Sequence, residues 1–137
     1  MEMVKNNVVL TDEAKMVDTM AKFIGLVGKQ MPDDVVAALE RLQAEESNPM
    51  AKVLYNSMSI ELNRPTCQDT GVIQFFVKVG TKFPLIDKVQ EILREAVLQA
   101  TKNAPLRHNA VETFDEFNTG TNTGTRTPWL DWEIVPN

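Results

Sequence analysis

The sequence has one cysteine and one histidine in 137 residues. A single cysteine excludes an internal disulfide, which fits a reducing cytoplasm and leaves one thiol for metal or redox chemistry. Basic residues are outnumbered by acidic ones, 14 against 19, which gives a formal net charge of −5. Because there is no basic excess to release counterions from phosphates, nucleic acid is not expected as a partner.

Long hydrophobic runs are also missing. No stretch approaches the roughly 20 apolar residues that a membrane helix needs. The first residues, Met1 to Asn7, lack the basic start and apolar core of a signal peptide. We therefore expect a cytoplasmic protein with no membrane segment. No internal repeat or linker interrupts the chain, and its length suits one domain.

Apolar spacing predicts helices in the N-terminal half. Thr11, followed by Asp12 and Glu13, is typical of a helix start with acids in the first turn. Further helices are expected after Met31-Pro32 and from Asn48-Pro49 into residue 62, because proline is favoured in a first turn. The first helix carries an apolar stripe along one face, namely Met16, Met20, Phe23, Ile24 and Val27. The methionines of the helical stripes, Met16, Met20, Met50 and Met58, are expected to lie in the core or at a subunit contact.

The remaining periodic segments predict a small sheet and one long helix. Residues 72–79 are β-branched and aromatic between two glycines, which is typical of a strand. Residues 86–100 carry the strongest helical spacing. Residues 129–135 alternate as a strand, with Leu130, Trp132 and Ile134 on one face. The expected fold class is therefore α+β, with N-terminal helices packed on a small sheet.

The segment from 102 to 128 is rich in Asn, Thr, Gly and Pro, and is expected to be a loop. A loop of that length with little structure of its own is unusual inside a compact domain. The strand after it, with Trp129 and Trp132, is typical of a sheet whose neighbouring strands are missing. We therefore expect an incomplete domain that continues beyond the chain end.

The most informative string is Arg64-Pro65-Thr66-Cys67-Gln68-Asp69-Thr70-Gly71. Pro65 disfavours a helical conformation at Arg64, so the preceding helix is expected to end there. Asp69 and Gly71 favour a tight turn. A sulfur, an amide and a carboxylate thus occupy consecutive positions on a constrained loop, where functional sites are often built.

This string resembles the signature of the iron–sulfur-dependent class I fumarate hydratase and L(+)-tartrate dehydratase family. Residues 106–109 and Pro128-Trp129 are most similar to the alpha-subunit sequences of the tartrate dehydratase branch. The resemblance implies that residues 1–137 are the N-terminal portion of the catalytic, cluster-binding alpha domain. It runs in the same order from about residue 15 to 136, through Met31 to Val36, Phe75 to Gly80, Ala104 to Val111, Asn118-Thr119-Gly120 and Asn122-Thr123-Gly124.

By this resemblance, Cys67 is one of three cysteine ligands of a [4Fe-4S] cluster, a role that requires a soft thiolate. The other two cysteines of the family pattern are absent here, so this chain alone is not expected to hold the cluster. Gln68 and Asp69 are implied to line the substrate pocket. The amide would orient a carboxylate or hydroxyl, and Asp69 would act in catalysis at the substrate hydroxyl or in proton transfer. From the residues alone, both are equally well explained as loop formers.

Arg107 is implied to bind a substrate carboxylate, which suits the planar, two-pronged guanidinium. Taken alone it would be a surface arginine, but its neighbours predict a packed segment. His108 is expected to structure the loop rather than to act as an acid or base. The strings at 118–120 and 122–124 are expected to be tight turns.

The implied activity is that of a hydro-lyase that converts L-tartrate to oxaloacetate, with the cluster as Lewis acid. A fumarate hydratase alpha subunit acting on malate and fumarate is the alternative within the family. The implied partners are a C4 dicarboxylate substrate and a beta subunit or C-terminal domain, in a homo- or hetero-oligomer. A thiol sensor built on Cys67 and a non-catalytic interaction fragment remain open.

Overall fold

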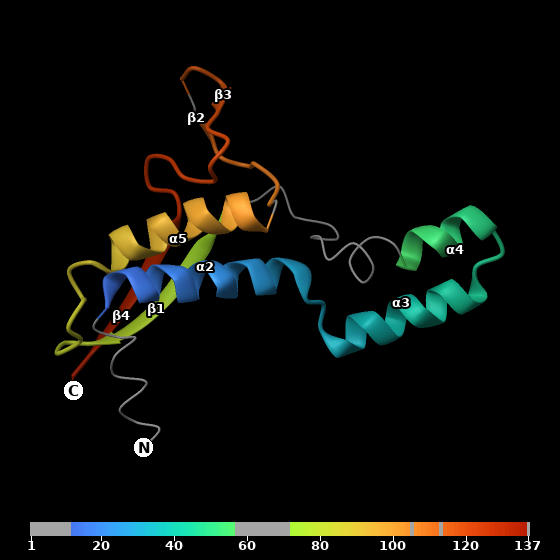
Figure 1. The fold of residues 1–137 in the computed structure, drawn as a ribbon, viewed down its shortest axis with the longest axis horizontal. Helices are drawn as coiled ribbons and strands as arrows, with labels where there is room; N and C mark the ends of the chain where they lie inside the picture. Colours follow the sequence, from blue (N-terminus) through green and yellow to red (C-terminus); the bar gives the residue numbers. More distant parts are fainter. Residues whose placement is uncertain (1–11, 57–71, 105, 113, 137) are drawn as a thin grey trace.

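The computed structural model describes residues 12–56, 72–104, 106–112 and 114–136. Within these ranges three helices are followed by a strand, a long helix and three further strands (Figure 1). In chain order the elements are α2 (Glu13–Lys29), α3 (Asp33–Glu45), α4 (Pro49–Asn56), β1 (Gln74–Gly80), α5 (Val89–Asn103), β2 (Val111–Glu112), β3 (Phe117–Asn118) and β4 (Trp129–Val135).

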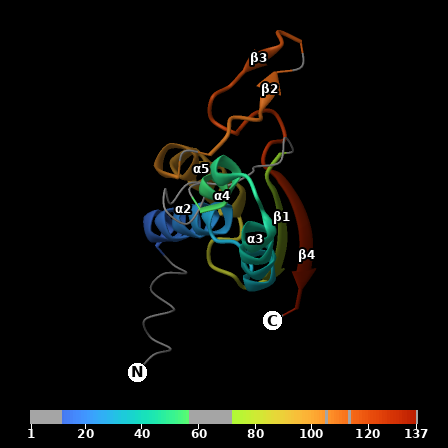
Figure 2. The same ribbon diagram turned by 90° about the vertical axis from the view of Figure 1, so that its right-hand side faces the viewer.

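The strands β1 and β4 pair in parallel, with Phe75 opposite Leu130 and Lys78 opposite Glu133. Parallel neighbours require a crossover connection, and here it contains α5 and the segment from 104 to 128. α2 and α5 lie over one face of this sheet (Figures 1 and 2). Side chains alternate accordingly, since Val79 is only 9% exposed whereas Phe76 is 78% exposed.

The core is concentrated between α2 and α5. Ile92 and Val97 on α5 are completely buried. The buried residues of α2 lie one turn apart, Val17, Ala21 and Gly25, and Ala21 packs in one cluster with Ala96 and Ala100 of α5. A Cβ atom added to Gly25 would lie 3.2 Å from the Cβ of Ala104. The two helices are therefore in close contact near their C-terminal ends.

α3 and α4 lie beside each other, away from the α2 and α5 layer (Figure 1). The side-chain amide of Gln43 on α3 donates to the carbonyl of Lys52 on α4 at 3.1 Å. No side chain of α3 is buried, and Val35 and Val53 are 40% and 62% exposed. The apolar spacing therefore predicted α3 and α4 correctly. It did not indicate that apolar residues such as Val35 and Val53 are exposed.

The expected α+β class is confirmed, and β4 occupies the expected residues 129–135. The expected apolar stripe on the first helix is only partly buried, because Phe23 and Val27 are 54% and 62% exposed. The helix after β1 begins at Val89 rather than 86, following a turn over 84–88. The segment from 102 to 128 is also more structured than expected, since β2 and β3 form a short antiparallel ladder.

The described helices include none with the length and apolarity to cross a membrane.

Candidate functional site

Arg107 lies in a short loop that follows α5, here called the Arg107 loop and defined as residues 106–110. The described side chains at its two ends are buried, with Leu106 5% and Ala110 6% exposed. Arg107 and His108 between them are exposed. Both ends of the loop are thus buried, in agreement with the predicted packed segment. Arg107 itself lies at the surface.

A buried asparagine holds the backbone of this loop. The side-chain amide of Asn122 donates to the carbonyl of Arg107 at 2.9 Å. Its oxygen accepts the backbone N–H of Asn109 at 2.7 Å. Asn122 is only 6% exposed, and its φ of 56° lies in the left-handed region that asparagine tolerates better than most residues. One side chain therefore fixes the backbone on both sides of His108.

Asn122 is itself anchored to α5. Its amide makes a second donation, to the hydroxyl of Thr101 at 3.2 Å, and Thr101 is 4% exposed. The Thr101 hydroxyl donates to the carbonyl of Val97 one turn earlier, at 2.7 Å. Because buried polar groups are costly unless paired, this chain of hydrogen bonds both satisfies Asn122 and ties the Arg107 loop to a rigid helix.

A second asparagine supports the same loop from its exposed side. The side-chain amide of Asn118 donates to the carbonyl of His108 at 2.8 Å. Its oxygen accepts the N–H of Gly120 at 2.9 Å, which closes a local turn. The backbone N–H of Thr119 donates to the carbonyl of Ala110 at 2.9 Å. The expected turn at 118–120 is present, and it also braces the Arg107 loop.

The Arg107 loop lies toward the end of the fold where both long strands begin. β1 and β4 start at this end and run away from it in parallel (Figure 1). The N–H of Trp129 donates to the carbonyl of Ile73 at 3.1 Å and joins the two strand starts. The described chain resumes at Val72, two residues before β1 begins at Gln74.

Cys67, Gln68 and Asp69 lie outside the described residues, so only Arg107 of the predicted site residues has described geometry. In the described part of the chain, no three His, Cys, Asp or Glu side chains gather as a metal site requires. The complete sequence offers one cysteine, whereas the resemblance implies three cysteine ligands. The donor set of this chain alone therefore does not fit a complete [4Fe-4S] cluster.

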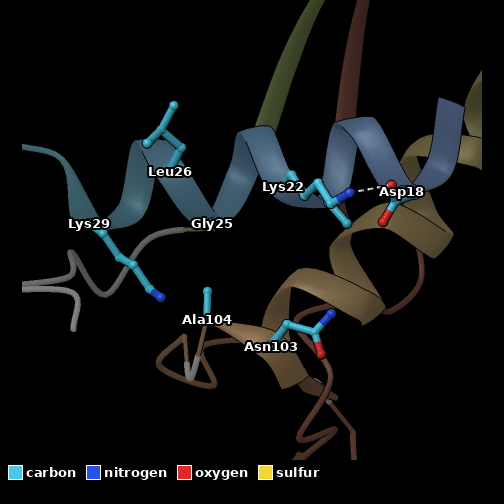
Figure 3. Close-up of a pocket in the computed structure, with 8 residues that line it drawn as sticks. Asp18, Lys22, Gly25, Leu26, Lys29, Asn103 and Ala104 are labelled. Carbon is cyan, nitrogen blue, oxygen red and sulfur yellow. Dashed lines mark hydrogen bonds and ion pairs between the residues drawn. The ribbon is translucent and has the colours of Figure 1, made fainter. Parts of the chain in front are cut away.

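A surface groove of about 300 Å³ lies between α2 and α5 (Figure 3). The buried Gly25 and Ala104 line it, and Lys22, which also lines it, pairs with Asp18 at 2.6 Å. Lys29 and Asn103 are its other polar residues. Arg107, the described member of the predicted site, does not line it, and its described lining residues form no arrangement of acid and base that suggests catalysis.

Sequence reasoning missed the role of Asn122. The string Asn122-Thr123-Gly124 was expected to form a tight turn of its own, but the side chain of Asn122 reaches Thr101, Arg107 and Asn109 instead. Both Asn122 and Thr123 are buried, at 6% and 5% exposure. A spacing pattern gives no signal for this contact, because its partners are 13 to 21 residues away in the chain.

Comparison with known proteins gives this arrangement its context. Residues 17–137 match the family described as Fumarate hydratase (Fumerase). The chain is 52% identical over 129 residues to an L(+)-tartrate dehydratase subunit alpha from Escherichia coli, and 51% identical to that of Shigella sonnei, in each case over 90% of this chain. A putative L(+)-tartrate dehydratase subunit alpha from Methanocaldococcus jannaschii is 32% identical over 88% of this chain.

The chain spans 43% to 45% of the length of these relatives, which agrees with the expectation of an incomplete domain. The family match, by contrast, covers almost the whole chain and includes α5, the Arg107 loop and both long strands. The chain therefore belongs to the Fumarate hydratase (Fumerase) family.

Proposed function

We propose that this chain is part of a hydro-lyase that removes water from a C4 hydroxy-dicarboxylate, with L-tartrate as substrate and oxaloacetate as product. The observation that carries the proposal is membership of the fumarate hydratase family together with about half identity to relatives named as tartrate dehydratase alpha subunits. Because the chain spans less than half of those relatives, the activity is proposed for the complete enzyme of which residues 1–137 are the N-terminal portion.

Arg107 is proposed to bind a carboxylate of the substrate. A dicarboxylate carries charge that must be neutralised before electron density builds on the carbon next to it. A guanidinium suits this task because its planar fork matches a carboxylate and remains charged at all working pH values. The exposed position of Arg107 on a backbone fixed by Asn122 supports the role, since a fixed backbone limits the freedom lost on binding.

Gln68 and Asp69 are proposed as further substrate contacts. They precede β1, which begins at Gln74, by a few residues in the chain. Dehydration breaks a C–O bond and a C–H bond on neighbouring carbons. We assign the Gln68 amide to orienting a substrate carboxylate or hydroxyl, and Asp69 to the substrate hydroxyl or to proton transfer.

Cys67 is proposed as one thiolate ligand of a [4Fe-4S] cluster whose remaining ligands lie outside residues 1–137. The relatives' names describe a subunit alpha, which supports a second polypeptide, or an equivalent C-terminal domain, as partner in an oligomeric enzyme. This division of the site explains how a chain with one cysteine can belong to an enzyme that needs several.

A fumarate hydratase that interconverts malate and fumarate is the second candidate, favoured by the family description itself. The test is a comparison of kcat/KM for L-tartrate and L-malate with the complete enzyme, prepared without oxygen. Higher kcat/KM for L-tartrate is expected. Higher kcat/KM for L-malate would support the second candidate, and turnover of neither would contradict the hydro-lyase proposal.

A further inference from the structure

We propose that Asn122 is a positioning residue for substrate binding and acts through Arg107, an inference that rests on the proposed role of Arg107. Asn122 does not need to touch the substrate for this role. It fixes the carbonyl of Arg107 and the N–H of Asn109, at 2.9 and 2.7 Å, and so sets the backbone from which the guanidinium projects.

The chemistry of the position favours asparagine over its near relatives. The site needs one acceptor, for the Asn109 N–H, and two donors, for the Arg107 carbonyl and the Thr101 hydroxyl. A primary amide offers both on one planar group, whereas a carboxylate offers only acceptors. The backbone φ of 56° is a further constraint that asparagine meets at little cost.

The anchor makes this contact more than a loop-to-loop hydrogen bond. Thr101 lies within α5, and its hydroxyl already donates to the Val97 carbonyl. Through Asn122, the backbone of Arg107 is therefore held at a fixed place on α5. This helix is part of the core, and its Val97 is completely buried. Pre-organisation of this kind lowers the entropy lost when an arginine binds an anion.

Two substitutions separate positioning from simple structural support. Asn122→Asp keeps the shape and loses both donors, so an oxygen would face the Arg107 carbonyl. Asn122→Gly removes the side chain but keeps a residue that accepts positive φ, which Asn122→Ala would not do. Ile92→Ala serves as the control, because Ile92 is completely buried on α5, outside residues 106–110, and its truncation opens a cavity in the core.

The measurements are KM and kcat of the complete enzyme, and the inhibition constant of succinate, which has two carboxylates and no hydroxyl to eliminate. Both Asn122 variants should raise KM and the succinate constant by about tenfold, with kcat within about twofold, since a ground-state contact is weakened. Ile92→Ala should lower Tm and leave both constants unchanged. Unchanged constants in the Asn122 variants alongside a lower Tm would overturn the proposal.

The double variant Arg107→Met, Asn122→Asp tests the route of the effect. If Asn122 acts through Arg107, the double variant should bind succinate no more weakly than Arg107→Met alone, because contacting residues in one pathway are not additive. A further loss would overturn the route through Arg107. If Arg107→Met by itself changes neither KM nor the succinate inhibition constant, the proposed function of Arg107 is wrong. If Arg107→Met changes them but the Asn122 variants do not, only the inference about Asn122 is wrong.

Discussion

Gly25 on α2 and Ala104 at the end of α5 meet so closely that a Cβ atom on Gly25 would lie 3.2 Å from the Cβ of Ala104. Gly25 is buried, and Ala104 is 4% exposed. This contact fixes the separation of the two helices just before the chain enters the Arg107 loop. The small side chains are therefore part of the framework that places Arg107.

Gly25→Val should destabilise the protein. Overpacking a close interface costs about 1–3 kcal/mol, and the better helix propensity of valine over glycine returns only about 0.4 kcal/mol. The Tm measured by circular dichroism should therefore fall. Thr19→Val, on the exposed face of the same helix, should leave Tm nearly unchanged. An unchanged Tm in Gly25→Val would show that α2 and α5 can separate without cost.

The packing of α2 shows where sequence patterns reach their limit. The large apolar residues correctly predicted the helix, and Met20 and Ile24 do pack against the core cluster. The face closest to α5, however, is formed by Val17, Ala21 and Gly25. The spacing of large apolar residues locates a helix, but it does not identify the face that packs most closely. Small residues form that face here, because they let the backbone of α2 come close to α5.

The pair Lys78 and Glu133 tests whether surface charge links the two long strands. Their side chains meet at 2.6 Å, but they remain 66% and 62% exposed. Exposed ion pairs contribute at most about 1 kcal/mol and are screened by salt. Lys78→Met should therefore lower Tm only slightly, and less so in high salt. A large, salt-independent loss would mean that this pair is shielded from water in the complete enzyme.

The candidate site was only partly accessible to sequence reasoning. The fold class, the final strand and the packed setting of Arg107 followed from apolar spacing and from the neighbours of Arg107. Asn122 did not, because its hydrogen bonds to Thr101 and Arg107 join segments that periodicity treats as unrelated. Cys67, Gln68 and Asp69 stay predictions from the sequence string and its resemblance.

Cys67→Ser in the complete enzyme should lose the iron–sulfur absorbance together with activity, because a hydroxyl is a poor substitute for a thiolate at iron. Residues 1–137 alone, with their single cysteine, should show neither a stable cluster nor turnover. Anaerobic reconstitution followed by ultraviolet–visible spectroscopy measures both. A variant that keeps the wild-type absorbance would remove Cys67 from the set of ligands.

Arg107→Lys provides the most direct test of the central claim, that this chain supplies a carboxylate-binding arginine to a hydro-lyase. Lysine keeps the charge but loses the two-pronged geometry. The loss of one charge-assisted hydrogen bond, about 1.5–3 kcal/mol, should lower kcat/KM roughly ten- to a hundredfold with cluster absorbance unchanged. Arg107→Met should reduce kcat/KM further. Near-wild-type kcat/KM in both variants, with a reduced Tm, would contradict the claim and make Arg107 a structural residue.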